Sequence, residues 1–328
     1  MKPTVISFNH SLEPELKQRI EQHAELLDFT HTKTPADDPK FMEALATADA
    51  VIGSSLKFGA ELIDKAPRLK VVSSVSAGVD NYDVEALNQR GILLCNTPDA
   101  LTETVADAGF ALILASARRV VELANWVRDG QWQKSLTPER FGKDVHHATL
   151  GIVGMGRIGA AIARRARFGF NMNVLYHNRS QHQGYEEEIG VEYRSFEELL
   201  KESDFVCTTL PYSEQTAGMF NAAAFEMMGK DSVFINIGRG GVVDEPALIA
   251  ALENGTIKAA GLDVFAKEPL SADSPLAQLD NVVALPHLGS ATEATRYAMA
   301  ELAVDNLIAA LAGKRPQCPY NWKQIGNE

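Results

Sequence analysis

Three side chains in the last third of the chain have the types needed for acid–base chemistry on a carbonyl compound. They are Arg239 in FINIGRGGVVDE, Glu268 in AAGLDVFAKEP and His287 in VVALPHLGSAT. An arginine can bind a carboxylate and polarise a carbonyl, and a histidine can donate a proton to the carbonyl oxygen. A carboxylate on the other ring nitrogen orients the imidazole and favours its protonated form. A lone histidine beside a proline is more often structural, so the hypothesis depends on the ordered set.

A glycine-rich turn lies upstream, in the segment LGIVGMGRIGAAIARRA. It has the form G-x-G-x-x-G and follows an apolar run; its residues are Gly154, Met155, Gly156, Arg157, Ile158 and Gly159. Gly154 permits a tight turn, Gly156 lets a pyrophosphate approach backbone N–H groups, and Gly159 lets helix and strand touch. The small alanines that follow favour close packing of the helix. We therefore predict a dinucleotide-binding turn, with a generic strand-to-helix turn as the alternative.

The segment YHNRS follows the next predicted strand, about 20 residues after the glycines, where an acidic residue usually contacts the adenosine ribose. Here His177 occupies that position, which removes the repulsion that a carboxylate would exert on a 2′-phosphate. Arg179 can pair with such a phosphate through its planar guanidinium, and Asn178 and Ser180 can add hydrogen bonds. The pattern predicts NADP(H), with NAD(H) as a less preferred cofactor. The alternative is that Arg179 is a solvated loop residue.

Arg239, Glu268 and His287 each follow a predicted strand, and ligands bind beyond the carboxyl ends of strands in an open α/β sheet. Combined with the dinucleotide motif, their chemistry predicts hydride transfer to C2 of a small 2-oxo acid.

The elements that must position these groups alternate between strands and helices, which predicts an α/β fold with parallel sheets. The predicted strands are Val5–Phe8, Ala50–Gly53, Leu69–Val75, Gly91–Cys95, Leu150–Val153, Met172–Tyr176, Phe205–Leu210, Val233–Ile237, Ala259–Leu262 and Val282–Ala284. Helical patterns cover Pro14–Leu27, Thr102 to about Arg119, and Ser290–Leu311, the last beginning with a sequence that resembles a capping box. The apolar middle of the second pattern favours a helix buried between larger units.

A chain of 328 residues has room for two domains at about 100–200 residues each. We predict a dinucleotide-binding Rossmann domain over residues 101–287. The long terminal helix is expected to pack on the first domain, so that residues 1–100 and 288–328 form one discontinuous substrate-binding domain.

Composition limits the partners. The formal net charge of −12 disfavours nonspecific binding to nucleic acid or an anionic membrane. The longest strongly apolar run, Ala108–Ala115, is far shorter than the ~20 residues of a membrane span, and no signal peptide is evident. The three cysteines are scattered, which favours a reducing cytoplasm and no metal site. The His146-His147 pair is interpreted as a surface feature because adjacent side chains are expected to point apart.

With these motifs the chain resembles the D-isomer-specific 2-hydroxyacid dehydrogenase family, in the branch of glyoxylate/hydroxypyruvate and 2-ketogluconate reductases. The resemblance covers nearly the whole length and is carried by LTETVADAGFALILASARR, LGIVGMGRIG, FINIGRGGVVDE, AAGLDVFAKEPL and LPHLGSAT. It implies two Rossmann-like or flavodoxin-like domains with the active site in the cleft between them. It also implies that Arg239 binds substrate, that Glu268 partners the histidine and that His287 donates the proton.

The resemblance assigns further contacts. In VSAGVDNYD the backbone N–H groups of Ser76, Ala77 and Gly78 would hold the substrate carboxylate, and a small-residue turn of this kind suits anion binding; a plain turn is the alternative. Arg179 and Ser180 match phosphate-binding positions. Other matches place Thr104 and Asp263 near the nicotinamide and Leu210-Pro211 near the adenine. Ile237, Gly238 and Gly289 are also predicted to contact the cofactor.

The family also implies a homodimer, with residues Ala117–His147 as the candidate interface. Relatives often have a tryptophan before the glycine motif, whereas here LTPERFGKDVHH offers only Phe141, so the substrate preference is left open.

Two other hypotheses for the function remain. One is a dinucleotide-sensing protein of the corepressor type, disfavoured because no basic region or added tail is evident. The other is an NAD-linked enzyme of the phosphoglycerate dehydrogenase type, disfavoured by His177 and by the lack of a regulatory C-terminal domain.

Overall fold

The computed structural model describes residues 2–326 and divides into two units, each with its own parallel sheet. The first unit contains the residues up to Leu101 and those from Ala291 onward, and the second contains Thr102–Ser290. The chain is therefore an α/β protein with two sheets of parallel strands, as the alternation in the sequence predicts.

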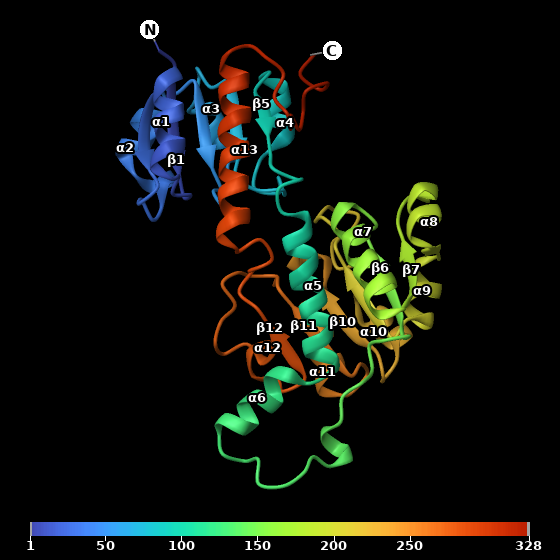
Figure 1. Ribbon diagram of the computed structural model, residues 1–328. Helices are drawn as coiled ribbons and strands as arrows, with labels where there is room; N and C mark the ends of the chain where they lie inside the picture. The colour runs from blue at the N-terminus through green and yellow to red at the C-terminus, as the bar shows by residue number, and fades with distance from the viewer. Residues whose placement is uncertain (1, 327–328) are drawn as a thin grey trace. The chain divides into compact units, whose positions relative to one another are not determined.

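The first unit has a five-stranded sheet in the order β2-β1-β3-β4-β5, which is the flavodoxin-like order (Figure 1). Its strands are β1 Thr4–Phe8, β2 Glu25–Phe29, β3 Ala50–Gly53, β4 Val71–Ser74 and β5 Leu93–Cys95. Its helices are α1 Pro14–His23, α2 Pro39–Leu45, α3 Ala60–Asp64, α4 Val84–Gln89 and α13 Glu293–Leu311.

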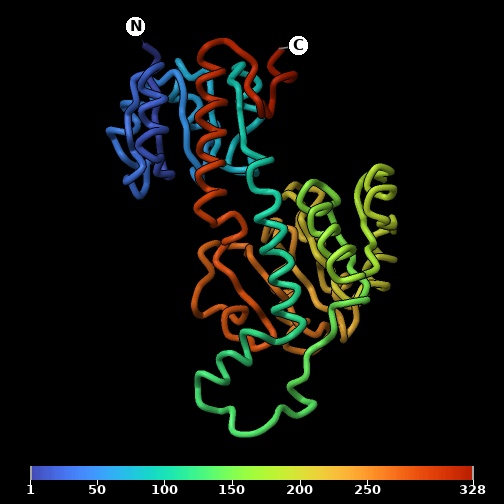
Figure 2. The backbone as a smooth tube through the Cα atoms, in the orientation of Figure 1, coloured from blue at the N-terminus to red at the C-terminus, as the bar shows by residue number. Residues whose placement is uncertain are grey.

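Helices cover both faces of this sheet because its strands are apolar on both sides. One face joins α2, α3 and α4 in a core that includes Ile6, Phe41, Leu62, Leu87 and Leu94. On the other face, α13 packs against β3, β4 and β5 and beside α1, as the red helix of Figure 2 shows. The last helix of the chain therefore packs on the sheet formed by the first part of the chain.

The sequence prediction was wrong at two helix boundaries. The helix predicted over Pro14–Leu27 ends at His23, and Glu25–Phe29 is the edge strand β2, whose pairing with β1 decided its conformation. Its alternating polar residues resemble an amphipathic helix in a single sequence. The last helix begins at Glu293 rather than Ser290, because the Thr292 side chain caps it by accepting from the N–H of Thr295.

The second unit has a seven-stranded sheet in the order β12-β11-β10-β9-β6-β7-β8. Its strands are β6 Thr149–Val153, β7 Asn173–His177, β8 Glu192–Tyr193, β9 Phe205–Thr208, β10 Val233–Asn236, β11 Ala259–Leu262 and β12 Val282–Ala284. Its helices are α5 Thr102–Ala117, α6 Val120–Arg128, α7 Arg157–Arg164, α8 Gln183–Ile189, α9 Phe196–Glu202, α10 Ala222–Met228, α11 Glu245–Glu253 and α12 Pro275–Gln278. The two-residue strand β8 carries too little pattern for sequence analysis to detect.

The strand order of the second unit reverses at β6, from which the chain runs outward to β7 and β8 and then crosses over to β9. Such a reversal opens a crevice at the carboxyl ends of the two diverging strands, where doubly wound proteins bind their ligands. The glycine-rich turn follows β6, and Leu210 follows β9, so both lie at this point. One face of the sheet packs against α9, α10, α11 and α12.

Helix α5 packs on the opposite face of the same sheet, against β10, β11 and β12 and beside α7. Most of its residues are buried, which fits the apolar pattern that predicted a buried helix. A Cβ on Gly109 would lie 3.1 Å from Ile162 and 3.4 Å from Ile237, so this glycine allows α5 to pack closely on α7 and β10. Between Lys2 and Gly326, none of the helices is both long enough and apolar enough to cross a bilayer.

Candidate active site

The glycine-rich turn has the geometry that its three glycines predict. Gly154 has φ 103°, a region that side chains disfavour, and its N–H donates to the carbonyl of His177 at 3.0 Å. A Cβ on Gly159 would lie 2.4 Å from the Gly154 carbonyl oxygen, so no other residue fits there. The turn is thus locked between β6, β7 and α7.

Gly156 meets a different requirement, because a Cβ built on it would contact nothing within 4 Å. It is the residue that precedes α7, whose first N–H groups have no partner inside the helix. The open space at Gly156 and the positive end of the helix dipole together suit a phosphate group. These residues fit the pyrophosphate of a dinucleotide.

The residues of YHNRS form the end of β7 and the loop that follows it. His177 is half-buried, and its Nδ1 lies 3.1 Å from the carbonyl oxygen of Arg194, to which it can donate. Asn178, Arg179 and Ser180 are at least partly exposed, and no polar partner is found for their side chains among the residues of the structure. They are therefore available to a ligand.

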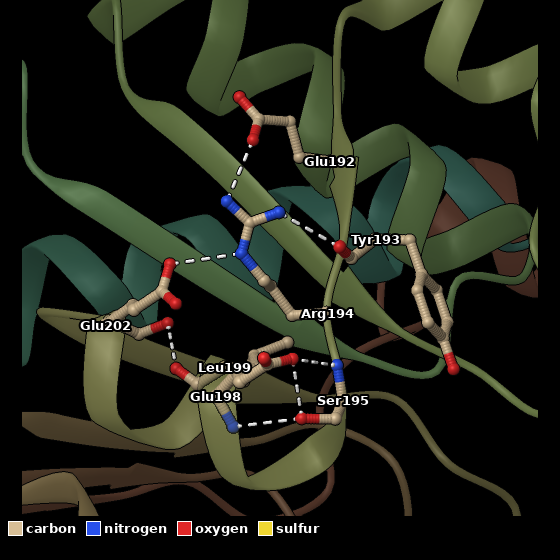
Figure 3. A network of polar contacts seen from close by, with 8 residues as sticks. Glu192, Tyr193, Arg194, Ser195, Glu198, Leu199 and Glu202 are labelled. Carbon is tan, nitrogen blue, oxygen red and sulfur yellow. Dashed lines mark hydrogen bonds and ion pairs between the residues drawn. The ribbon is translucent and has the colours of Figure 1, made fainter.

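A second arginine near this loop is already engaged (Figure 3). The guanidinium of Arg194 contacts Glu192 at 2.9 Å and Glu202 at 3.1 Å, and it also donates to the Tyr193 carbonyl oxygen. Hydrogen bonds from the guanidinium to Glu202 and then Glu192 raise the pKa of Arg194. Its charge is balanced within the protein, which leaves Arg179 as the arginine of this region without a carboxylate partner in residues 2–326.

The predicted acid–base pair is assembled within the second unit. Nδ1 of His287 lies 2.7 Å from Oε2 of Glu268, and the other carboxylate oxygen of Glu268 accepts from the N–H of Phe265 at 3.0 Å. About half of the His287 side chain is exposed, so Nε2 remains open to a ligand. The carboxylate can accept the Nδ1–H, which leaves Nε2 as the nitrogen from which the ring, when it carries both protons, can donate one.

Asp263 holds the turn that carries the histidine. His287 has φ 52°, an uncommon conformation for a residue with a side chain. The carboxylate of Asp263, which is 1% exposed, accepts from the N–H groups of Leu288 at 2.8 Å and Gly289 at 2.9 Å. Burial raises the pKa of Asp263, and the two amide hydrogen bonds oppose that rise. Both oxygens of Asp263 are thus committed to the turn that carries His287, and the contact of Asp263 and Gly289 with the cofactor stays a prediction.

Arg239 follows β10 and is positioned by a residue that sequence reasoning missed. Asn236, 1% exposed, donates from Nδ2 to the carbonyl oxygen of Arg239 at 3.0 Å and accepts from the N–H of Gly238 at 3.0 Å. A Cβ on Gly240 would lie 1.9 Å from the backbone of Phe265, so the Arg239 turn packs directly on the segment leading to Glu268. The signal in the sequence was the side-chain amide of Asn236 at the end of an apolar strand, where a polar group needs hydrogen-bond partners.

The remaining predicted cofactor residues are found at several places in the second unit. Leu210 packs against two of the turns, because a Cβ on Gly154 or on Gly238 would contact its backbone. Pro211 is exposed and follows it, and Ile237 is 6% exposed beneath α5. Thr104 lies in the first turn of α5 and is partly exposed. The structure gathers Leu210 and Gly238 around the glycine-rich turn, while Ile237 serves the core.

The predicted substrate loop lies in the first unit, directly after β4. Its three carbonyl oxygens are all occupied. The carbonyl of Ser76 accepts from the N–H of Thr97 at 2.9 Å, and that of Ala77 accepts from Nδ2 of Asn96 at 2.7 Å. The carbonyl of Gly78 accepts from Oγ of Ser76 at 2.7 Å. No acceptor for the three N–H groups is present in the part of the chain that the structure describes. The turn therefore offers donors and no acceptors, as an anion site requires.

The prediction for the adjacent histidines was wrong in its geometry. The rings of His146 and His147 do not point apart; their Nδ1 atoms lie 2.9 Å apart, because His147 adopts φ 62°. Among residues 2–326, no group of three or more histidine, cysteine or carboxylate side chains is placed to hold a metal ion.

A strand-order reversal, a glycine-rich turn at a helix N-terminus and a carboxylate–histidine pair are together typical of a nicotinamide-dependent oxidoreductase. Comparison with known proteins gives the family. The profile of the D-isomer specific 2-hydroxyacid dehydrogenase NAD binding domain matches residues 110–289. A relative from Klebsiella pneumoniae named glyoxylate/hydroxypyruvate reductase B is 55% identical over 313 residues, 95% of this chain and 96% of its own.

Solved structures agree with this assignment. The NADPH-dependent glyoxylate/hydroxypyruvate reductase of Sinorhizobium meliloti, solved in complex with NADP and malonate, is 33% identical with a TM-score of 0.85, covering 97% of each chain. A glyoxylate reductase from Paecilomyes thermophila is 29% identical with a TM-score of 0.88, covering 97% of this chain and 98% of its own. The chain belongs to the D-isomer-specific 2-hydroxyacid dehydrogenase family, in its glyoxylate/hydroxypyruvate reductase branch, and is an NAD(P)-dependent oxidoreductase.

Replacing Asp263 by asparagine should disturb the histidine turn. An amide has one acceptor oxygen, so the N–H of either Leu288 or Gly289 loses its partner, and we expect kcat to fall about 10-fold or more. The matched control is Asp204→Asn, whose carboxylate also accepts from a backbone N–H, that of Thr149. This control should lower stability and leave kcat within about twofold. If Asp263→Asn changes only the KM for the cofactor, the carboxylate serves the cofactor rather than the turn.

Proposed function

We propose that the protein is an NADPH-preferring reductase of small 2-oxo acids, which it converts to D-2-hydroxy acids. Glyoxylate, hydroxypyruvate and 2-keto acids of the 2-keto-D-gluconate type are the candidate substrates. The observation that carries the proposal is the 2.7 Å contact between Glu268 and Nδ1 of His287 in a unit that also contains the glycine-rich turn. The names of the Klebsiella and Sinorhizobium relatives support the substrate class.

The histidine acts as the proton donor in this proposal. Glu268 accepts the Nδ1–H and orients the ring, so that the proton destined for the carbonyl oxygen is the one on Nε2. The cofactor, when bound, supplies the hydride that reduces C2. The exposure of the histidine is consistent with substrate access to Nε2.

The substrate carboxylate needs positive charge or N–H donors. Arg239 can bind it and polarise the keto group through its guanidinium, and its turn is held by Asn236. In the first unit, the N–H groups of Ser76, Ala77 and Gly78 can hold a carboxylate in the manner of a backbone anion site. Neither assignment requires a metal ion, because arginine and imidazolium supply the charge that the carbonyl oxygen develops.

The cofactor preference rests on the loop after β7. His177 leaves the position of the usual acid without negative charge, and Arg179 has a guanidinium that no carboxylate of residues 2–326 neutralises. Both features favour a 2′-phosphate over a ribose hydroxyl, hence NADPH over NADH. The Sinorhizobium relative, which is NADPH-dependent and was solved with NADP bound, is consistent with this preference.

A homodimer is the assembly that we propose, formed through α6 and the segment that follows it. Helix α6 has no buried residue, and large apolar side chains of this segment are exposed; they are Val120, Val121, Val127, Trp132, Leu136 and Phe141. Figure 2 shows the segment, in green, leaving the body of the second unit as an extended arm. An exposed apolar surface of this kind is typical of an interface between copies of one chain.

The cellular location that we propose is the cytoplasm. The three cysteines are buried free thiols, which suits a reducing compartment.

Replacing His287 by alanine removes the proton donor. We expect kcat for glyoxylate or hydroxypyruvate to fall by about 10²–10⁴, the range for a lost general acid, while NADPH binding measured by fluorescence changes little. His31→Ala, at an exposed histidine of the first unit, is the control and should retain full turnover. Near-normal kcat in His287→Ala would refute the assignment. Steady turnover by the unmodified enzyme also separates a reductase from a purely sensory protein.

Replacing Arg179 by alanine removes the phosphate-binding cation. We expect the KM for NADPH to rise about 10- to 100-fold and the KM for NADH to stay within about twofold, because only NADPH carries the 2′-phosphate. Arg194→Ala is the matched control, since this arginine is already paired with Glu192 and Glu202. An unmoved KM for NADPH in Arg179→Ala would return Arg179 to the role of a solvated loop residue.

The assembly can be tested by light scattering on the purified protein. We expect the mass of two chains at micromolar concentration and a shift towards one chain in Val120→Glu/Val127→Glu, because the two charges would have to be buried in the interface. Phe168→Glu, which changes a side chain that is 66% exposed outside the arm, should leave the mass unchanged. A single-chain mass for the unmodified protein contradicts the proposal.

A further inference from the structure

The hydroxyl group of Tyr176 closes the loop that carries the predicted phosphate ligands. Tyr176 is 0% exposed on β7, and its hydroxyl accepts from the N–H of His182 at 2.7 Å and donates to Oε1 of Glu186 at 2.6 Å. His182 is the residue that precedes α8, and its own side chain makes no capping hydrogen bond. The tyrosine is therefore the connection between the end of β7 and the start of the next helix.

The loop between these points, residues 177–181, is fixed at its beginning as well. The His177 carbonyl oxygen accepts from Gly154, and the His177 ring contacts the Arg194 carbonyl oxygen. Between the two ends, the side chains of Asn178, Arg179 and Ser180 face no polar partner within the described chain. The backbone of the 177–181 loop is thus held at both ends while its polar side chains remain available.

The chemistry of the tyrosine suits a permanent anchor. Burial, followed by the hydrogen bond to Glu186, raises the pKa of Tyr176 to about 12, so the hydroxyl keeps its proton at neutral pH. One hydroxyl satisfies one backbone donor and one carboxylate acceptor, and so uses both its oxygen and its hydrogen. A phenylalanine would fill the same core space but would not hold the His182 end of the loop.

We infer that Tyr176 and Glu186 are positioning residues that determine cofactor preference by holding the 177–181 loop ready for the 2′-phosphate. A loop that is ordered before binding loses less conformational entropy when the phosphate arrives, so the anchor contributes to affinity without touching the ligand. NADH has no phosphate at this position and gains nothing from the anchor. The inference rests on the proposed preference for NADPH and adds two residues that act through the loop.

The test compares Tyr176→Phe with the unmodified enzyme, using NADPH and NADH in turn. We expect the KM for NADPH to rise about three- to tenfold, while kcat and the KM for NADH stay within about twofold. Tyr193→Phe is the matched control, because its ring packs on that of Tyr176 at 5.5 Å while Figure 3 marks no hydrogen bond from its hydroxyl. An equal rise in KM for both cofactors would show a general packing role and overturn the inference.

Tyr176 is buried, so Tyr176→Phe could change the KM by disturbing the fold, and a second pair of variants at Glu186 tests the same contact from a partly exposed position. Glu186→Ala removes the acceptor of the tyrosine hydroxyl from a partly exposed helix position, and we expect it to raise the KM for NADPH about two- to fivefold. Glu186→Gln keeps an acceptor oxygen and should behave as the unmodified enzyme. A KM for NADPH that is unchanged in Glu186→Ala and in Tyr176→Phe overturns the inference.

The double variant Tyr176→Phe/Arg179→Ala separates this inference from the proposed function. If the tyrosine acts through the loop, the double variant should have a KM for NADPH no higher than about twice that of Arg179→Ala, since coupled residues are not additive. Fully multiplicative effects would overturn the inference and leave the role of Arg179 intact. If Arg179→Ala alone has no effect, the proposed role of Arg179 fails. In that case the positioning role of Tyr176 is retained only if Tyr176→Phe still raises the KM for NADPH and leaves the KM for NADH unchanged; otherwise this role fails as well.

Discussion

The hydrogen bond between Glu268 and Nδ1 of His287 is the interaction on which the site of the second unit depends. It requires two segments from the ends of β11 and β12 to present their side chains to each other at 2.7 Å. Asp263 makes this possible, because its buried carboxylate holds the turn at Leu288 and Gly289 and so keeps His287 in an unusual backbone conformation. The cost of burying that carboxylate is offset by two amide donors, which is the general condition for a buried polar group.

Close backbone approach is the second constraint. Gly159 against the Gly154 carbonyl oxygen, and Gly240 against Phe265, are contacts that any Cβ would prevent. They bring α7 onto β6 and the Arg239 turn onto the segment that leads to Glu268. Gly156, in contrast, is open, so the missing side chain serves a ligand and not the packing. The chain therefore requires glycine at Gly159 and Gly240 for close packing, whereas the glycine at Gly156 leaves room for a ligand.

Much of this arrangement could be predicted because strand ends in a parallel sheet meet at one edge. The alternation of strands and helices, the glycine motif and the order of Arg239, Glu268 and His287 were sufficient to place the acid–base residues beyond the carboxyl ends of neighbouring strands. The edge strand β2 and the short β8 could not be predicted in this way, because pairing with a neighbour, rather than local pattern, decided their conformation. The same holds for the facing rings of His146 and His147, which depend on a left-handed backbone.

The sequence by itself determined the fold class and the family, and it determined which residue types are available at each strand end, since periodicity and motif spacing are local properties. Only the tertiary structure decided how those residues are held. Asn236 and Tyr176 look like ordinary strand residues in the sequence. Their polar atoms acquire a role only when the chain brings Gly238, Arg239, His182 and Glu186 within hydrogen-bond distance. The difference between Arg179 and Arg194 was likewise decided by space, because two carboxylates that face Arg194 neutralise one guanidinium and leave the other available for a phosphate.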